Sequence, residues 1–511
     1  MEVKDKNVTI VGLARSGIGA ANLLSELGAN VTVTDVKREP ELKDFIQRLN
    51  PSVRLAVGEH PPEIFLSSDM LVVSPGVPLS IRPISDAKKK GIPVIGELEL
   101  AYQIATCGSD NPSIAPEIPP TFPLERGGMG DLKEGREGGF LAVTGTNGKS
   151  TTTALLDFMM KKGGFGTILG GNIGNALTEE IRKALRVKGE EIKGRTSHAL
   201  RLTRIDYIVA EVSSFQLESI KDFRPKGATI LNVTPDHLDK YRSLEEYSDA
   251  KARIFENQGS GDFLVLNRDD PETMKIVKKK LEMKGEKPKT VFFSRREEVE
   301  GLYSKGGMVY CNLPDLSGVS STSPFTNAEE IRIKGVHNLE NAMAASAMAL
   351  LAGCPVAAVI DSLREFSGLE HRLEFVRELK GVAYFNDSKG TNVSAVMKSL
   401  ESFQQPVILI AGGRDKAGDF SLLRHLVREK VKAIVLIGEA GEKIQRALGD
   451  LTYTSMAKDL RDAVDMSRAK AAKGDVVLLS PACASFDMFL NFEDRGRQFK
   501  EIVMEMDNGE I

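Results

Sequence analysis

The sequence lacks several features that would assign it to a specialised class of protein. It has only four cysteines, and no two of them form a Cys-x-x-Cys pair. This usage indicates neither a zinc site nor a disulfide framework, and it fits a reducing cytoplasm. No apolar run approaches the ~20 residues that a membrane-spanning helix needs, and no signal-peptide pattern precedes the first predicted strand. We therefore expect a cytoplasmic protein that does not enter a membrane.

The chain also lacks an excess of charge of either sign. Its 68 basic and 71 acidic residues give a formal net charge of −3. Nucleic acid is not an expected partner, because its recognition normally requires a strong basic surface. Small acidic substrates must then be bound by local positive charges. A length of 511 residues allows about three domains of ~150 residues each.

The most informative segment is residues 141–151, with the sequence LAVTGTNGKST. An apolar strand predicted at 140–143 enters a glycine-containing turn, and a helical run follows at 152–160. In such a turn the backbone N–H groups and the helix dipole favour phosphate, and Lys149 adds positive charge. The hydroxyl of Ser150 or Thr151 can then hold magnesium. The turn is shorter than the general phosphate-binding pattern, and a plain strand–turn–helix is the alternative.

Residues 7–35 are typical of a Rossmann-like unit, with strands predicted at 7–11 and 31–35 and a helix at 20–27. The dinucleotide fingerprint is incomplete, because Ala14 replaces the second glycine, which lets the backbone approach a pyrophosphate. Asp35 either contacts a ligand or is a turn residue. Further strands at 69–73 and 93–95 complete a first domain, predicted at 1–103.

Two segments have compositions that do not indicate a packed core. Residues 104–139 are rich in proline and glycine, so we predict a linker or insertion between the first domain and the second. Residues 183–204 are basic and polar, which predicts a solvated insertion; contact with an acidic partner is the alternative.

The second domain is predicted at 140–368 and the third at 369–511. Apolar strands alternate with helices in both, as a covered parallel sheet requires. The predicted strands lie at 167–169, 207–211, 228–232 and 263–267, then at 383–386, 407–411, 433–437 and 476–480. Polar loops follow three of the later strands, at 386–392, 412–416 and 480–485. Because strand ends meet at one sheet edge, these loops predict a site for a small anionic molecule.

Two residues of the second domain, Glu211 and His237, are candidates on local grounds, whereas nothing local marks Lys251. Glu211 ends a strand at the carboxyl edge of the sheet and suits a magnesium ligand; a solvent-facing strand end is the alternative. His237 follows the next strand, as either a ligand or a structural histidine. Lys251 lies in a helix predicted at 244–256, where an exposed lysine is the default expectation.

Together these motifs resemble those of the ATP-dependent Mur ligases over nearly the whole chain. The motifs that carry the resemblance are residues 144–151, 170–174, 211–218, 232–237, 337–338, 371–372, 387–392 and 480–492. The last two are similar to those of the members that add D-glutamate. The resemblance implies an α/β fold of three domains: an N-terminal Rossmann-like domain for the UDP-sugar, a central P-loop ATPase-like domain with a parallel or mixed sheet, and a C-terminal Rossmann-like domain for the amino acid.

The activity that the resemblance implies is the ATP-dependent addition of D-glutamate to UDP-N-acetylmuramoyl-L-alanine through an acyl phosphate, with release of ADP and phosphate, in peptidoglycan precursor synthesis. It further implies ATP and two Mg²⁺ ions as cofactors, carbamylation of Lys251, and closure of the third domain to exclude water. We expect a monomer whose partners are its small-molecule substrates. The alternatives are a related Mur or folylpolyglutamate-type ligase for another amino acid, an NAD-dependent dehydrogenase and a nucleotide switch.

The resemblance also assigns roles to individual residues. Those implied for catalysis are Lys149, Glu211, His237, Lys251, Arg372 and Lys389. Those implied for ATP binding are Gly145, Thr146, Asn147, Gly148, Lys149, Ser150, Thr151, Asn338, Asn341, Arg372 and Asp387. Those implied for the UDP-substrate are Arg15, Ser16, Asp35, Lys37, Gly76 and Asn172, and those for D-glutamate are His237, Thr391, Lys416, Ser485 and Phe492. The implied metal ligands are Ser150, Glu211, His237 and carbamylated Lys251.

Overall fold

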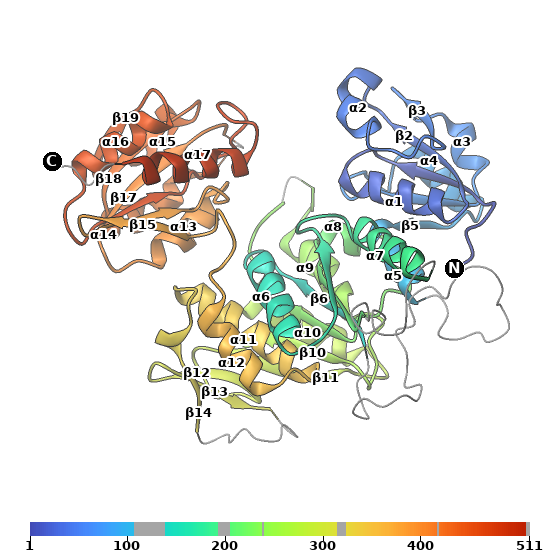
Figure 1. Cartoon of the computed structure of the whole chain (residues 1–511), viewed down its shortest axis with the longest axis horizontal. Coiled ribbons are helices and arrows are strands. Elements are labelled where there is room, and N and C mark those ends of the chain that lie inside the picture. The colour runs from blue at the N-terminus through green and yellow to red at the C-terminus, as the bar shows by residue number, and fades with distance from the viewer. Residues whose placement is uncertain (107–137, 193–204, 238–239, 314–322, 416–417, 507–511) are drawn as a thin grey trace. The chain divides into compact units, whose positions relative to one another are not determined.

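The structure is a computed structural model that describes residues 1–106, 138–192, 205–237, 240–313, 323–415 and 418–506. These residues form three sheets, and the chain divides into two compact units (Figure 1). The first unit comprises residues 1–330 and 340–364, and the second comprises residues 331–339 and 365–511. Within the described ranges, no helix combines the length and the apolar character needed to cross a bilayer.

The first sheet has five parallel strands in the order β3-β2-β1-β4-β5, which confirms the Rossmann-like prediction. Its strands are β1 (Asn7–Val11), β2 (Asn30–Asp35), β3 (Arg54–Val57), β4 (Met70–Val73) and β5 (Val94–Gly96). Its helices are α1 (Arg15–Glu26), α2 (Glu39–Ile46), α3 (Pro62–Leu66), α4 (Arg82–Lys89) and α5 (Glu97–Thr106).

Helix α1 begins at Arg15 rather than at residue 20, so the predicted start of this helix was wrong. The prediction treated Gly17 and Gly19 as turn residues. Both lie inside the helix, where close packing requires glycine: a Cβ at Gly17 would lie 2.2 Å from the carbonyl oxygen of Gly12.

The second sheet has nine strands in the order β14-β13-β12-β11-β10-β9-β6-β8-β7, parallel from β7 to β12 and antiparallel from β12 to β14. Its strands are β6 (Gly139–Thr144), β7 (Thr167–Gly171), β8 (Tyr207–Glu211), β9 (Gly227–Ile230), β10 (Phe263–Asn267), β11 (Lys289–Ser294), β12 (Gly301–Lys305), β13 (Met308–Asn312) and β14 (Pro324–Asn327). The mixed sheet agrees with the predicted fold class.

The helices around the second sheet are α6 (Lys149–Lys162), α7 (Leu177–Ile192), α8 (Ser214–Leu217), α9 (Leu244–Ala252), α10 (Pro271–Glu282), α11 (Val336–Leu351) and α12 (Val356–Glu365), with 3₁₀ turns at Arg253–Phe255 and Ala328–Glu330. Helix α9 is therefore shorter than the predicted 244–256. Helix α7 includes the first part of the segment 183–204. The rest of that segment lies outside the described residues, as does most of 104–139. Both predicted insertions, and the predicted domain limits, stay predictions.

The third sheet has six strands in the order β15-β16-β20-β17-β18-β19, and only β15 is antiparallel to its neighbour. Its strands are β15 (Glu374–Leu379), β16 (Val382–Asn386), β17 (Val407–Gly412), β18 (Val431–Ile437), β19 (Tyr453–Met456) and β20 (Val476–Leu479). The helices are α13 (Val393–Glu401), α14 (Arg424–Lys430), α15 (Gly441–Leu448), α16 (Leu460–Lys470) and α17 (Phe492–Glu505), with a 3₁₀ turn at Phe420–Leu423.

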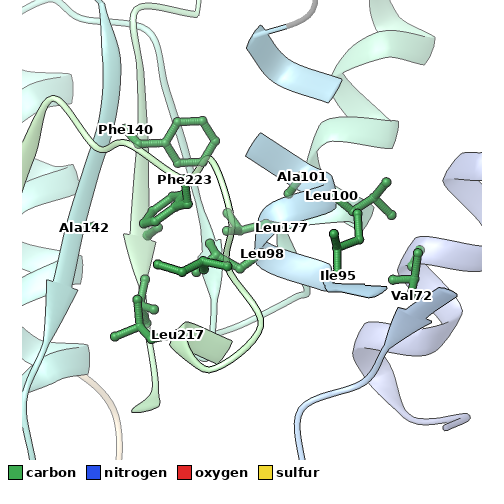
Figure 2. Close-up of a cluster of buried hydrophobic side chains, with 14 of the residues drawn as sticks. Val72, Ile95, Leu98, Leu100, Ala101, Phe140, Ala142, Leu177, Leu217 and Phe223 are labelled. Atoms are coloured by element: carbon green, nitrogen blue, oxygen red, sulfur yellow. The ribbon is translucent and has the colours of Figure 1, made fainter. Parts of the chain in front are cut away.

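One continuous apolar core joins the first sheet to the second. Figure 2 shows Leu98 and Ala101 of α5 between Ile95 of the first sheet and the side chains of Phe140 and Phe223 in the second domain, with Leu100 on the side of the first sheet. Phe140 and Phe223 pack edge to face, with ring centroids 5.6 Å apart. Burying each large apolar side chain contributes about 1.5–3 kcal/mol. Helix α5 therefore fixes the first domain on the second.

We predict that Leu98→Ala weakens this junction. Leu98 is fully buried, so its truncation leaves a cavity and should lower the free energy of unfolding by about 2–5 kcal/mol. Denaturant titration of the full chain measures the effect on the first unit. Leu55→Ala, at a side chain that is 39% exposed, is the control. Equal effects of the two substitutions would contradict the prediction.

Candidate active site

The turn between β6 and α6 has a backbone that requires glycine. Gly145 and Gly148 have φ of 152° and 84°, and Gly148 is the N-cap of α6. A Cβ at Gly148 would lie 2.2 Å from Oδ1 of Asn341, so only glycine fits beside this helix α11 side chain. Helix α6 begins directly after this turn, and the N–H groups of its first turn have no partner within the helix, as phosphate binding requires.

Asn232, just after β9, holds this turn in place. Its Oδ1 accepts the N–H of Asn147 at 2.9 Å, and its Nδ2 donates to the Asn147 carbonyl at 3.1 Å. Its own carbonyl accepts the N–H of Thr146, and the Thr146 hydroxyl accepts the N–H of Thr234 at 3.0 Å. Sequence reasoning used Asn232 only as part of a motif and missed this role.

Two lysine ammonium groups converge on the same turn. Nζ of Lys149 donates to the carbonyls of Gly145 and Thr146 at 2.9 and 2.8 Å, and Nζ of Lys251 donates to the Gly145 carbonyl at 2.9 Å. Lys251 is only 1% exposed, so the default expectation of a surface lysine was wrong. Burial, and next the nearby charge of Lys149, hold the pKa of Lys251 well below its usual value.

Glu211 lies at the end of β8, beside the phosphate turn, and is 1% exposed. Its Oε1 accepts Nδ2 of Asn172 at 2.6 Å, and its carbonyl accepts the Asn172 N–H at 2.9 Å. Its Oε2 is buried and has no hydrogen-bond partner among the described residues. A buried carboxylate oxygen without a donor is costly, and a hard cation such as Mg²⁺ would satisfy it. This oxygen is therefore available to a divalent cation, although the described residues bring together no group of three or more His, Cys, Asp or Glu side chains around one.

His237 stands at the exposed side of this site. Its backbone φ is 55°, an uncommon value for a residue with a side chain. The ring packs edge to face on Phe215, at 5.0 Å between centroids, and Nε2 lies 3.7 Å from Oδ2 of Asp236. The strained backbone and aromatic packing together fix the direction of a half-exposed imidazole.

At the edge of the first sheet, Asp35 organises the backbone of the glycine turn. Its carboxylate accepts the N–H of Leu13 at 2.7 Å and that of Lys37 at 2.9 Å. This geometry supports the turn-residue alternative for Asp35. Nη1 of Arg15, in contrast, donates to the carbonyl of Gly174 at 2.8 Å, in the turn after β7. Arg15 therefore reaches from α1 to the second sheet.

The other residues predicted for the UDP-substrate lie near this edge. Ser16 is in the first turn of α1, and Gly76 follows β4 with φ of 94°. The side-chain amide of Asn172 donates a hydrogen bond to the Glu211 carboxylate. Their contacts with a substrate stay predictions.

In the second unit, Asp387 connects helix α13, the residue after β20 and the segment before β15. Its Oδ2 accepts the hydroxyls of Ser399 and Ser480 at 2.6 and 2.7 Å, and Oδ1 accepts the N–H of Leu373 at 3.3 Å. Burial raises the pKa of Asp387 to about 6, against the effect of these hydrogen bonds. The carboxylate thus holds three segments of its own domain together through hydrogen bonds.

Other predicted residues of the second unit gather at the same sheet edge. Nζ of Lys389 lies 3.7 Å from the ring centroid of Phe492, a cation–π contact. Thr391 immediately precedes the N-cap of α13, and Ser485 is buried after β20. Lys416 lies outside the described residues.

The predicted ATP contacts near α11 fall in both units. Asn338 and Arg372 belong to the second unit, and Nδ2 of Asn338 donates to the Lys334 carbonyl at 2.8 Å. Asn341 belongs to the first unit, beside Gly148. The convergence of both units on one triphosphate stays a prediction.

Arg495 of α17 is a fully buried side chain that sequence reasoning missed. Its Nε donates to the Ser388 hydroxyl at 2.9 Å, and Nη2 donates to the carbonyls of Ser388 and Cys483. Burial lowers its pKa to about 10. The guanidinium thereby ties together two of the three predicted polar loops. An arginine in an amphipathic helix gives no local signal of such burial.

We predict that Asn232→Ala weakens the binding of nucleoside triphosphate. The substitution removes both side-chain hydrogen bonds to Asn147, each worth about 0.5–1.5 kcal/mol, so the dissociation constant should rise roughly tenfold. Titration with a fluorescent ATP analogue measures it. Asn312→Ala, on an exposed position of β13, should leave the affinity unchanged. An unaltered affinity in Asn232→Ala would show that the turn holds its shape without this residue.

Family models match most of the chain. The Mur ligase MurD-like N-terminal domain matches residues 6–96, the Mur ligase middle domain matches residues 143–349, and the Mur ligase glutamate ligase domain matches residues 371–483.

Curated relatives match over their full length. The UDP-N-acetylmuramoylalanine–D-glutamate ligase of Geotalea uraniireducens is 43% identical over 511 residues, covering 100% of this chain and 99% of the relative. The ligase of the same name from Geotalea daltonii is 43% identical over 513 residues and covers 100% of both chains.

Solved structures share the fold at low sequence identity. UDP-N-acetylmuramate-alanine ligase MurC from Thermotoga maritima has a TM-score of 0.55 and 18% identity, covering 98% of this chain and 99% of that chain. MurF ligase from Thermotoga maritima in complex with ADP has a TM-score of 0.56 and 16% identity, covering 99% and 96%.

Proposed function

The chain belongs to the Mur ligase family, and on that premise we propose that it is the ligase that joins D-glutamate to UDP-N-acetylmuramoyl-L-alanine, with cleavage of ATP to ADP and phosphate. The observation that carries the proposal is the full-length match, at 43% identity, to relatives that are named for this reaction. The product is a cytoplasmic precursor of peptidoglycan, and the enzyme acts as a monomer on small-molecule substrates.

Phosphoryl transfer to the alanyl carboxylate brings several negative oxygens together, so positive charge must be in place beforehand. Lys149 supplies such a charge at the turn, where its ammonium is held by two backbone carbonyls. Backbone N–H groups at the start of α6, from Gly148 to Thr151, bind the phosphates, whereas those of Thr146 and Asn147 donate to Asn232. Asn341 lies against this turn. Asp387, Arg372 and Asn338 complete the ATP contacts.

Magnesium, when bound, supplies positive charge that neutralises phosphate oxygens in the transition state. The free Oε2 of Glu211 supports its role as a ligand of one ion, together with Ser150. His237 is assigned to a second ion. Asn172 keeps the Glu211 carboxylate in one orientation through its amide.

We further propose that Lys251 is carbamylated. Its lowered pKa favours the neutral amine, whose nitrogen attacks carbon dioxide, forms an N–C bond and loses a proton. The product is an anion. It forms an attractive pair with the Lys149 ammonium, beside which a second ammonium would be unfavourable. A carbamate can also ligate magnesium, which an ammonium cannot do.

D-Glutamate binds on the C-terminal domain. The residues assigned to it are Thr391, Lys416, Ser485 and Phe492, with His237 from the central domain and Lys389 nearby. Its amine attacks the acyl phosphate, the tetrahedral intermediate expels phosphate, and an amide remains. A lysine ammonium such as that of Lys416 is a natural partner for a substrate carboxylate.

We expect D-glutamate, and not L-alanine or a diamino acid, to support ADP release with UDP-N-acetylmuramoyl-L-alanine. Mass analysis of the product identifies the amide. Lys149→Ala should lower turnover by at least about a hundredfold, because it removes charge from the phosphate site. The control is Lys162→Ala, at the exposed end of the same helix. Turnover with L-alanine in place of D-glutamate would overturn the assignment.

For Lys251 we expect activity to fall in buffers depleted of carbon dioxide and to return on addition of bicarbonate. Lys251→Ala should lose at least about a hundredfold in turnover, as expected when a charged group that stabilises the transition state is removed. Short carboxylic acids should restore part of the activity by replacing the carbamate. Labelling with ¹³C-bicarbonate and NMR detect the adduct directly. Carbamylation would be disproved if the wild-type protein incorporated no ¹³C label and its activity did not change with the concentration of carbon dioxide.

A further inference from the structure

Helix α5 carries two buried carboxylates that bind backbone of the second domain. Glu99 accepts the N–H groups of Lys221, Asp222 and Phe223 at 2.8, 3.0 and 3.0 Å. Glu97, two residues earlier, accepts both the N–H and the hydroxyl of Thr178 at 2.8 Å. Helices α1, α5 and α7 pack side by side within the first unit (Figure 1).

Glu97 caps helix α7 from a different domain. Thr178 lies in the first turn of α7, where backbone N–H groups have no partner within the helix and the helix dipole favours a negative charge. The second carboxylate oxygen, Oε2, is buried without a hydrogen-bond partner among the described residues, and burial raises the pKa of Glu97. Such a group costs about 1–3 kcal/mol. A contribution to the stability of the fold therefore does not by itself explain a carboxylate at position 97.

The turn that precedes α7 leads directly to Glu211. Gly171 donates its N–H to the carbonyl of Asn175, which closes the turn, and the amide of Asn172 projects from it onto the Glu211 carboxylate. Arg15 holds the other side of the turn at the Gly174 carbonyl.

We propose that Glu97 is a positioning residue for Glu211. Glu97 fixes the start of α7, and this in turn fixes the preceding turn at residues 171–175. Asn172 in that turn then holds the Glu211 carboxylate in the orientation that a cation requires. Arg15 is the second anchor of the same turn. The domain assigned to the UDP-substrate thus sets the geometry of a metal ligand in the ATP-binding domain. This inference rests on the proposed role of Glu211 as a metal ligand.

The test measures Mn²⁺ binding, by electron paramagnetic resonance, to the full chain with ADP present. Glu97→Ala should weaken Mn²⁺ binding by about tenfold or more, as is typical when a group that orients a metal ligand is lost. Glu97→Gln retains an acceptor oxygen for Thr178 and should recover most of the affinity. Hydrogen exchange of the amides at residues 171–178 should accelerate in the alanine variant and not in the glutamine variant.

A purely structural role predicts a different result. If Glu97→Ala lowers the melting temperature but leaves Mn²⁺ affinity at the wild-type value, the inference is wrong. Arg15→Met provides a second test that does not disturb the core, because the Arg15 side chain is exposed. It should weaken Mn²⁺ binding in the same direction, whereas the control Arg54→Met on β3 should not. Unchanged affinity in both Glu97→Ala and Arg15→Met would also overturn the inference.

The outcome is separable from that of the proposed function. A loss of Mn²⁺ affinity in Glu97→Ala would support the inference even if the enzyme joined an amino acid other than D-glutamate. Conversely, a wild-type protein that joins D-glutamate but whose Mn²⁺ affinity is unaffected by Glu211→Gln would overturn the inference and leave the ligase assignment intact.

Discussion

The concentration of positive charge at the Gly145 carbonyl is the interaction on which the proposed active site depends. Two lysines donate to this single oxygen, one from the phosphate turn and one from helix α9. Two ammonium groups in a buried place repel each other, and the repulsion is relieved when anionic oxygens enter or when one amine loses its charge. The same arrangement therefore favours a triphosphate and a carbamate.

The sequence predicted most of the fold, because its strands are short apolar runs that end in polar or glycine residues. The ends of β8 and β10 were predicted at the observed residues, and the phosphate turn lies where its glycines placed it. The start of α1 was not predicted. Its glycines serve close packing of the helix and not a turn, a distinction that depends on neighbours distant in sequence.

The candidate site was predictable only in part. Residue types and strand ends identified Lys149 and Glu211, since phosphate and magnesium chemistry need those groups at a sheet edge. Burial of Lys251 and Arg495 could not be predicted, because exposure of a lysine or arginine in a helix is set by the elements that pack on it. The hydrogen bonds of Asn232 to the phosphate turn also depend on tertiary contact, because they join segments that follow the neighbouring strands β9 and β6.

The docking of α5 also attaches the first two domains to each other by non-covalent contacts, in addition to the peptide that connects them. The contacts of Glu97 and Glu99, with the apolar face around Leu98, join residues before 107 directly to residues after 137. A polypeptide cleaved within that interval would keep its two fragments associated, and separately expressed halves would reassemble by the same surface.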